Sequence, residues 1–170
     1  AGAMVSAGNT GAATAASLLA WRQMPGIHRP AIATLMPNRS SHFLLLDAGA
    51  SPDVDPQHLV EFALMGMAYA EQVMGKKNPR VHLLNIGEEP GKGNAFAKRV
   101  QELMGEHEWF AGNIEGKDLF RTDPDVVVCD AFQYRSMFLV STADAPINSA
   151  CITSRSPGLG KKKNPKLSPA

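Results

Sequence analysis

Phe43-Leu44-Leu45-Leu46-Asp47 is a short, uninterrupted apolar run that ends in an aspartate. Polar residues precede the run, and Ala48-Gly49 follows it. A strand with one face in water alternates apolar and polar residues, whereas a parallel strand covered on both sides is apolar throughout. The run therefore predicts a strand that is buried on both faces.

Similar runs recur further along the chain. Val81 to Ile86 is closed by Gly87, and Asp125-Val126-Val127-Val128-Cys129-Asp130 again ends in an aspartate. Shorter strands are predicted at residues 3–6 and 109–112.

Helical segments separate these runs. Asp55-Pro56 places an acidic N-cap before a proline at the first helical position, and apolar residues then recur at three- and four-residue steps up to Val73. Gly75 is placed to end this helix. Two further helices are predicted over residues 12–22 and 94–104.

The alternation of strands and helices predicts an α/β fold with a mostly parallel, Rossmann-like sheet and flanking helices. In such sheets, ligands bind beyond the carboxyl ends of the strands. Polar residues stand just after the strands, namely Ser6 to Thr10, Asp47, Asn85 to Glu89 and Asp130. We therefore expect the ligand site among them.

The composition is that of an ordinary globular protein. The 170 residues suit one domain, with 44% hydrophobic and 19% charged residues, and a net charge of +1 gives no reason to expect nucleic acid as a partner. There is no transmembrane-length apolar run and no signal peptide. Cys129 and Cys151 form no cluster, which favours a reducing, cytoplasmic setting and leaves a single disulfide open. The five histidines are scattered and are expected on the surface or in loops, and no metal is expected. No cofactor is expected either. No G-x-S-x-G elbow is present, so a hydrolase triad has no support.

The composition changes after about Phe132. Residues 133–170 hold six Lys or Arg, six serines, four prolines and a single acidic residue, Asp144. Residues 1–132 are interpreted as part of an α/β domain. Residues 133–170 are interpreted as an atypical basic tail, either disordered or produced by a frameshift.

The first candidate site is the turn Ser6-Ala7-Gly8-Asn9-Thr10-Gly11, which joins the end of a predicted strand to a helix. Backbone N–H groups at a helix N-terminus form an anion site, and Ser6, Asn9 and Thr10 add side-chain donors. A plain turn capped by Thr10 explains the pattern equally well.

The second candidate is Gly87-Glu88-Glu89-Pro90-Gly91-Lys92-Gly93-Asn94. It departs from the Walker pattern because Gly93 stands where Ser or Thr would hold magnesium, which disfavours a nucleoside triphosphate site. The loop either holds phosphate through Lys92 or is an exposed loop with a solvated lysine. For Asp47 and Asp130, a ligand contact and a helix cap remain equally open.

In order and spacing, these motifs resemble the PlsX family of phosphate acyltransferases over residues 3 to about 132. The segments that carry the resemblance are Ser6 to Ala12 (SAGNTGA), Pro25 to Ala31 (PGIHRPA, family PGIDRPA), Leu44 to Ala50 (LLLDAGA, family LLLDVGA), His58 to Ala70, Asn78 to Val81 (NPRV), Leu83 to Glu89 (LLNIGEE), Lys92 to Asn94 (KGN), Gly112 to Asp118 (GNIEGKD, family GNVEGRD) and Asp125 to Asp130.

The resemblance implies a reaction of acyl-[acyl carrier protein] with inorganic phosphate that gives acyl-phosphate and free acyl carrier protein. It also implies a fold related to phosphotransacetylases, a homodimer, and a cytosolic enzyme that visits the membrane surface. The implied catalytic residues are Asn85, Lys92 and Asp130. The implied phosphate- or substrate-binding residues are Ser6, Gly8, Asn9, Thr10, Gly11, Asp47, Gly87 and Asn94. The alternatives are a phosphotransacetylase that uses coenzyme A and an inactive truncated fragment.

The sequence also departs from the family. The opening strand with its DAMGGD motif is absent, and Ser51-Pro52 replaces an asparagine and a valine. The family continues with DGFxGN where this chain reads Asp130-Ala131-Phe132-Gln133. The expected sheet is therefore truncated at both ends.

Overall fold

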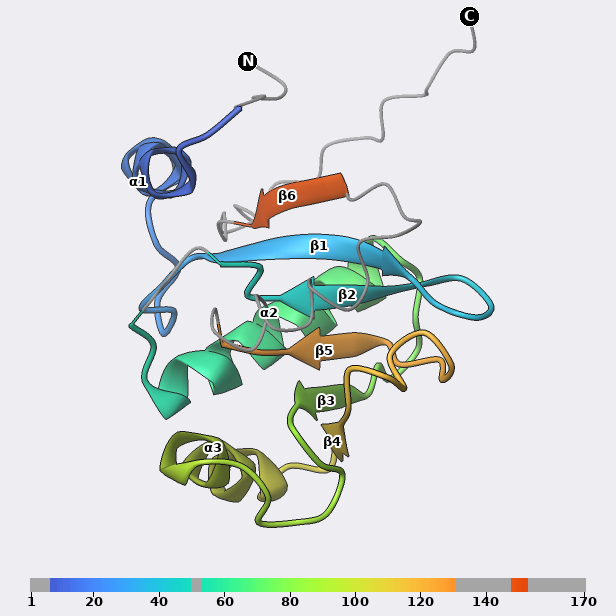
Figure 1. The fold of residues 1–170 in the computed structure, drawn as a ribbon. Coiled ribbons are helices and arrows are strands. Elements are labelled where there is room, and N and C mark those ends of the chain that lie inside the picture. Colours follow the sequence, from blue (N-terminus) through green and yellow to red (C-terminus); the bar gives the residue numbers. More distant parts are fainter. Residues whose placement is uncertain (1–6, 50–52, 131–147, 153–170) are drawn as a thin grey trace, which may run out of the picture.

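The computed structural model describes residues 7–49, 53–130 and 148–152, the last range by its backbone. The strand predicted at residues 3–6 lies outside the described residues. Figure 1 labels the elements, which are α1 (Thr10–Trp21), β1 (Ala31–Pro37), β2 (His42–Leu46), α2 (Pro56–Gln72), β3 (Val81–Leu84), α3 (Ala95–Gly105), β4 (Phe110–Ile114), β5 (Val126–Val128) and β6 (Asn148–Ile152).

The strands form one six-stranded sheet in the order β4-β3-β5-β2-β1-β6. The four strands from β4 to β2 run parallel, whereas β1 pairs antiparallel with both β2 and β6. Val127 of β5 pairs with Leu45 on one side and His82 on the other. The predicted mostly parallel α/β sheet is confirmed, with an antiparallel edge.

The apolar runs are buried on both faces, as predicted. In β2, Leu44 and Leu46 belong to the core on the helical face, whereas Phe43 and Leu45 belong to the core on the other face. All four are at most 1% exposed. Successive side chains of a strand point to opposite faces of the sheet. A strand that is covered on both faces is therefore apolar at every position.

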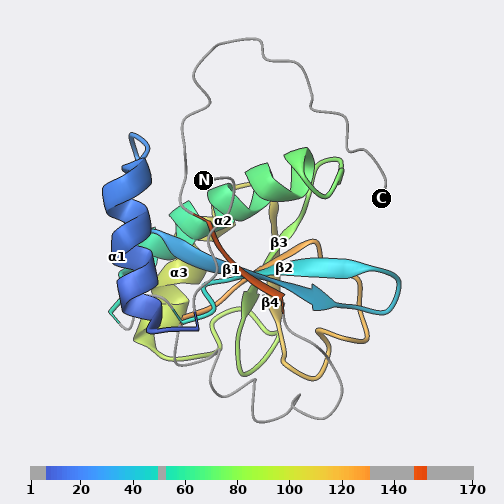
Figure 2. The same cartoon turned by 90° about the horizontal axis from the view of Figure 1, so that it is seen from above.

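The helices α2 and α3 cover one face of the sheet (Figure 1), and Figure 2 shows α2 and the return from β4 to β5 on opposite faces. Both βαβ crossovers step in the same direction along the sheet, so right-handed connections place both helices on one face. The return segment runs in the opposite direction and covers the other face. Its Leu119 is fully buried, and its Phe120 meets Phe43 edge-on with ring centroids 6.2 Å apart.

The predicted ends of α2 are confirmed. Asp55 is its N-cap and Pro56 its first residue, and the Asp55 backbone N–H donates to Nδ1 of His58 at 2.9 Å. Gly75 has a φ of +70°, and the N–H of Lys76 donates back to the Ala70 carbonyl oxygen at 3.0 Å. Glycine favours this left-handed backbone conformation after a helix because it carries no Cβ.

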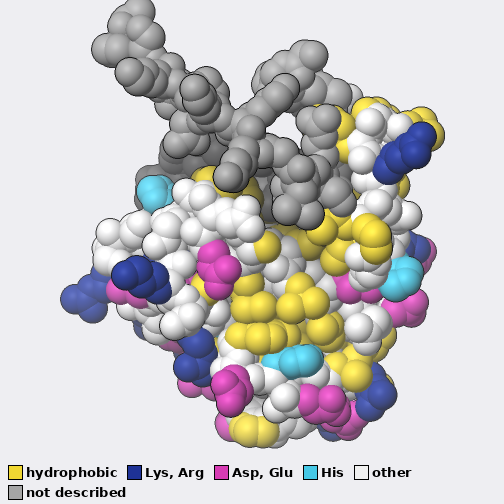
Figure 3. Space-filling model, turned by 180° about the vertical axis from the view of Figure 1, so that it is seen from behind, with side chains coloured by type: hydrophobic (Ala, Val, Ile, Leu, Met, Phe, Trp, Pro, Cys, Tyr) yellow, Lys and Arg dark blue, Asp and Glu magenta, His cyan; other side chains and the backbone are white. Residues whose placement is uncertain are grey.

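The surface of α2 is partly apolar. Its Leu64 is 46% exposed, and Figure 3 shows apolar side chains gathered on the back of the molecule, the side on which α2 lies. None of the helices in the described residues has the length and apolar character needed to cross a bilayer.

Two strands are additional to those predicted. The strand β1 begins after Pro30 and ends with Pro37, and these prolines hide its pattern. The strand β6 lies in the segment after Phe132, where no strand period is sustained. The remainder of the predicted basic tail, residues 133–147 and 153–170, falls outside the described residues.

Candidate active site

The carboxyl ends of four parallel strands meet at one edge of the sheet. Asp47 follows β2, Asn85 follows β3 and Asp130 follows Cys129 at the end of β5. Asp47 is 1% and Asn85 5% exposed, whereas Asp130 is half-buried. The sheet thus gathers three of the predicted polar residues at its carboxyl edge, as expected for an α/β site.

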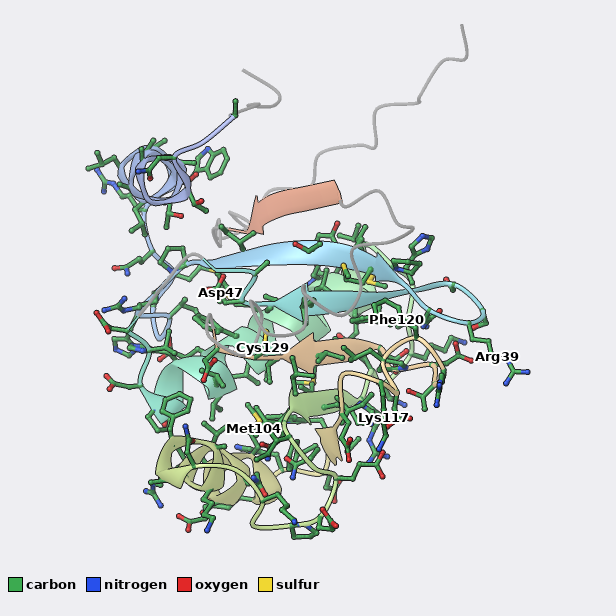
Figure 4. The ribbon with its side chains drawn as sticks, in the orientation of Figure 1. Arg39, Asp47, Met104, Lys117, Phe120 and Cys129 are labelled. Atoms are coloured by element: carbon green, nitrogen blue, oxygen red, sulfur yellow. The ribbon has the colours of Figure 1, made fainter. Side chains whose placement is uncertain are left out.

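Asp47 and Cys129 extend the pairing of β2 with β5, and both lie at this edge in Figure 4. The Asp47 N–H donates to the Cys129 carbonyl oxygen at 3.2 Å, and the Cys129 N–H donates to the Leu46 carbonyl oxygen at 2.7 Å. Burial raises the pKa of the Cys129 thiol, and the nearby charges of Asp47 and Asp130 raise it further. The thiol therefore stays protonated, which disfavours it as a nucleophile.

Asn85 holds the loop that follows β3. Its side-chain Nδ2 donates to the Lys92 carbonyl oxygen at 2.8 Å, and its Oδ1 accepts from the N–H of Ile86 at 2.8 Å. Gly93 packs against it with a φ of +99°, and a Cβ there would lie 2.7 Å from Oδ1 of Asn85. Only glycine fits this close approach.

The loop itself contains a tight turn. The Lys92 N–H donates to the Glu89 carbonyl oxygen at 3.2 Å, with Pro90 second and Gly91 third at a φ of +82°, the pattern of a type II turn. Gly87 is buried beneath it, and a Cβ there would lie 2.9 Å from Oε2 of Glu89. The turn leaves Lys92 exposed, and within residues 7–49 and 53–130 it has no ion pair.

Asn94 and Asn9 are helix N-caps. Oδ1 of Asn94 accepts from the Ala97 N–H at 2.8 Å, and Oδ1 of Asn9 accepts from the Ala12 N–H at 3.1 Å. Thr10 is therefore the first residue of α1, and the cap of the plain-turn alternative is Asn9 rather than Thr10. Each cap leaves neighbouring backbone N–H groups at the start of its helix, where they favour anions.

The two predicted loops do not lie together. Figure 1 places α1, which follows the Gly8–Gly11 turn, and α3, which follows the Gly87–Asn94 loop, at opposite ends of the sheet. Ser6 lies outside the described residues. The described geometry joins Asp47, Asn85, Asp130 and the Gly87–Asn94 loop to the carboxyl edge, and a shared role for the first turn stays a prediction.

Two residues of the site were not predicted. Gln101 of α3 contacts the loop through both ends of its side-chain amide, and Nδ2 of Asn113 in β4 donates to the Glu89 carbonyl oxygen at 3.2 Å. No motif marks Gln101, and Asn113 lies in the GNIEGKD segment without any sign of its contact with the loop. Each contact depends on how the loop folds back on α3 and β4. In the described part of the chain, no group of three His, Cys, Asp or Glu side chains is placed to hold a metal ion.

His82 departs from the surface or loop setting expected of the histidines, whereas His28 is exposed in a loop as expected. His82 is half-buried in β3, so that expectation is wrong for it. His28 is exposed but tied to Glu61, a buried residue of α2. The two carboxylate oxygens of Glu61 meet the His28 backbone N–H at 2.8 Å and Nδ1 at 2.6 Å, which anchors the segment between α1 and β1.

The fold is shared with solved enzyme structures. EutD phosphotransacetylase from Staphylococcus aureus matches with a TM-score of 0.52 at 15% identity, over 78% of this chain and 47% of its own. A phosphotransacetylase from Streptococcus pyogenes matches with a TM-score of 0.54 at 15% identity, over 86% of this chain and 51% of its own. At this level of identity the similarity establishes the α/β fold alone.

The sequence is similar to curated bacterial proteins named phosphate acyltransferase. The proteins from Halothermothrix orenii and Thermodesulfovibrio yellowstonii are each 50% identical, over 133 and 131 residues, and that from Heliobacterium modesticaldum is 52% identical over 131 residues. Each match covers 76% of this chain, which spans only 38–40% of the length of these relatives. The profile of a family described as "Fatty acid synthesis protein" matches residues 1–138, most of the chain, and the chain therefore belongs to the fatty acid synthesis protein family.

Proposed function

We propose that this chain is the segment of a phosphate acyltransferase that carries the carboxyl-edge loop of the sheet. The observation that supports this most strongly is the loop on β3, where Lys92 is exposed while Asn85 holds its main chain. The loop occurs in a chain half identical to proteins named phosphate acyltransferase.

The proposed reaction joins inorganic phosphate to an acyl group carried as a thioester on acyl carrier protein. A phosphate oxygen attacks the thioester carbonyl carbon, a carbon–oxygen bond forms, the carbon–sulfur bond breaks, and the carrier thiol leaves with a proton. No covalent enzyme intermediate is needed, so the work of the enzyme is to position phosphate and to stabilise the oxyanion.

The carboxyl-edge residues divide this work in our proposal. Lys92 supplies positive charge to phosphate, and Asn85 together with Gly87 keeps the loop in place. Asn94 caps α3, and the N-terminus of this helix binds the anion. Asp130 and Asp47 orient donors or accept the proton of the attacking phosphate.

The N-terminal turn has a parallel role in the proposal. Ser6, Gly8, Asn9, Thr10 and Gly11 contribute backbone and side-chain donors at the start of α1. Because α1 and α3 lie at opposite ends of the sheet, this turn would contact a different part of the substrate from Lys92, or a site completed by another chain.

The proposal extends to the partners implied by the family. They are acyl carrier protein, inorganic phosphate and a second subunit, in a cytoplasmic protein that associates peripherally with membranes and binds no nucleic acid. The division into an α/β domain over residues 1–132 and a separate tail over residues 133–170 belongs to the same proposal.

A transferase that uses coenzyme A is the second candidate, because the solved structures of similar fold are phosphotransacetylases. The 50% identity to phosphate acyltransferases favours the carrier-protein reaction. Phosphate-dependent release of carrier protein rather than coenzyme A distinguishes the two, and no acyl-phosphate from either donor would indicate an inactive fragment.

The role of Lys92 is tested in a full-length phosphate acyltransferase that has lysine at this position. Lys92→Ala should raise the KM for phosphate at least about tenfold, because a hydrogen bond to a charged group contributes about 1.5–3 kcal/mol. Lys98→Ala is the matched control, since Lys98 is an exposed lysine of α3 a short distance along the chain. An unchanged KM in Lys92→Ala would remove Lys92 from the phosphate site, as would an equal rise in both variants.

A further inference from the structure

Gln101 connects α3 to the loop that precedes the helix. It lies two turns beyond the Asn94 cap, and its Nε2 donates to the Lys92 carbonyl oxygen at 2.8 Å. Its Oε1 accepts from the Gly91 N–H at 2.9 Å. One side-chain amide is therefore paired with the main chain of two consecutive loop residues.

The Lys92 carbonyl oxygen is a meeting point of two elements. It accepts from Nδ2 of Asn85, at the end of β3, and from Nε2 of Gln101, in α3, with both distances 2.8 Å. A carbonyl oxygen has two lone pairs, so both acceptor positions are used. The main chain at Lys92 is thus held from the sheet and from the helix together.

This arrangement separates the two parts of Lys92. Its main chain is fixed by Asn85, Gln101 and the turn bond to Glu89, whereas its side chain is exposed without an ion pair among the described residues. A cation whose backbone is ordered before a ligand arrives loses less freedom on binding.

We infer that Gln101 is a positioning residue that fixes Lys92 for a phosphate-bearing substrate. This inference rests on the proposed function of the Lys92 loop. A purely structural role would predict instead that Gln101 holds α3 in place. That helix is anchored independently by Val100 and Met104, which are fully buried in the core.

The test uses the 170-residue chain labelled with ¹⁵N and titrated with inorganic phosphate, with the Lys92 and Gly93 amide signals as the readout. Gln101→Met keeps the length of the side chain and removes both hydrogen bonds, and Gln101→Ala is a second variant. Gln72→Met is the matched control, because Gln72 is an exposed glutamine at the end of α2. Each Gln101 substitution is repeated in a Lys92→Ala background.

We expect both Gln101 variants to speed hydrogen exchange at the Gly91 amide, while the Val100 and Met104 amides stay protected. The Kd for phosphate should rise about threefold or more, with no further rise in the Lys92→Ala background, because coupled residues lose their interaction only once. The control should change neither quantity.

Three results would overturn the inference. The first is an unchanged Kd in the Gln101 variants, or an equal change with and without Lys92, while phosphate still binds; this leaves the proposed function standing. The second is lost protection at Val100 and Met104 in both variants, which would assign Gln101 to holding the fold. The third is no phosphate binding by the unsubstituted chain, which would remove the phosphate site and the role of Gln101 with it.

Discussion

Oδ1 of Asp47 accepts a hydrogen bond from the backbone N–H of Ile32 at 2.8 Å. Asp47 ends the parallel half of the sheet, whereas Ile32 lies in the antiparallel strand β1. Both residues are buried. The Asp47 carboxylate therefore links the antiparallel strand β1 to the end of β2.

Replacing the Asp47 carboxylate should show how much its hydrogen bond to Ile32 contributes to stability. Asp47→Ala leaves the Ile32 N–H buried without this acceptor, so we expect the free energy of unfolding to fall by about 1–3 kcal/mol. Asp47→Asn retains an oxygen at the same place and should lose less. Urea denaturation measures both variants, with the exposed Asp53→Ala as control. If Asp47→Ala is as stable as the parent chain, the bond to Ile32 contributes nothing net.

Gly66 is a glycine in the middle of α2 that should not tolerate alanine. A Cβ there would lie 2.6 Å from Cγ1 of Val126 and 2.9 Å from Cδ1 of Leu46, at the centre of the sheet. Overpacking of this kind costs about 1–3 kcal/mol, which exceeds the gain in helix propensity. We expect Gly66→Ala to lower the Tm.

The matched substitution is Gly105→Ala at the end of α3. A Cβ at Gly105 meets no atom within 4 Å, so this variant should be neutral or gain up to about 1 kcal/mol. Equal effects of the two substitutions on thermal unfolding would contradict the close packing of α2 on β5.

His82 should make the chain less stable in acid. Burial lowers the pKa of His82 from its usual 6.5, the positive charge of Arg80 lowers it further, and Asp125 opposes the change. Its Nδ1 has no hydrogen-bond partner among the described residues. The unfolded chain therefore binds this proton more readily, so stability is retained above pH 6.5 and lost as the pH falls through the lower, folded-state pKa.

The measurement compares the free energy of unfolding at about pH 7.5 and about pH 5.5. His82→Phe, which cannot titrate, should show a smaller loss in acid than the parent chain. His42→Phe, at an exposed position of β2, serves as the control. The interpretation fails if His82→Phe loses as much stability in acid as the parent.

The thiol of Cys129 should react slowly while the chain is folded. It is fully buried with a raised pKa, so thiolate is scarce and access depends on unfolding. In a Cys151→Ser background, we expect maleimide labelling near neutral pH to be slow in buffer and to accelerate through the urea transition. Fast labelling in buffer, as in unfolded chain, would show that the end of β5 opens locally.

The parallel half of the fold could be predicted because its signals are local. Residues 43–46 and 126–129 are apolar without interruption, and Asp55-Pro56 marks a helix start through cap chemistry alone. The strand β1 carries no such clear signal, because Pro30 precedes it and Pro37 ends it.

Some residues of the candidate site could also be predicted from the sequence, and others could not. Asp47, Asn85 and Asp130 could be placed because the ends of parallel strands meet at one edge. Gln101 could not, because a glutamine on a helix carries no mark of the loop that it contacts. Asn9 and Asn94 cap helices, and their role in phosphate binding stays a prediction, because a side chain that caps a helix and one that binds an anion leave the same signature in a sequence.

The position of β5 has a consequence for how the chain reaches its native state. This three-residue strand lies between β2 and β3, so the hairpin β1–β2 and the unit β3–α3–β4 share no strand pairing until it arrives. During synthesis from the amino end, two sub-assemblies emerge first, each with an open edge. The sheet becomes continuous only after residue 128 is made, and such non-local closure makes folding slow and exposes the intermediate to aggregation.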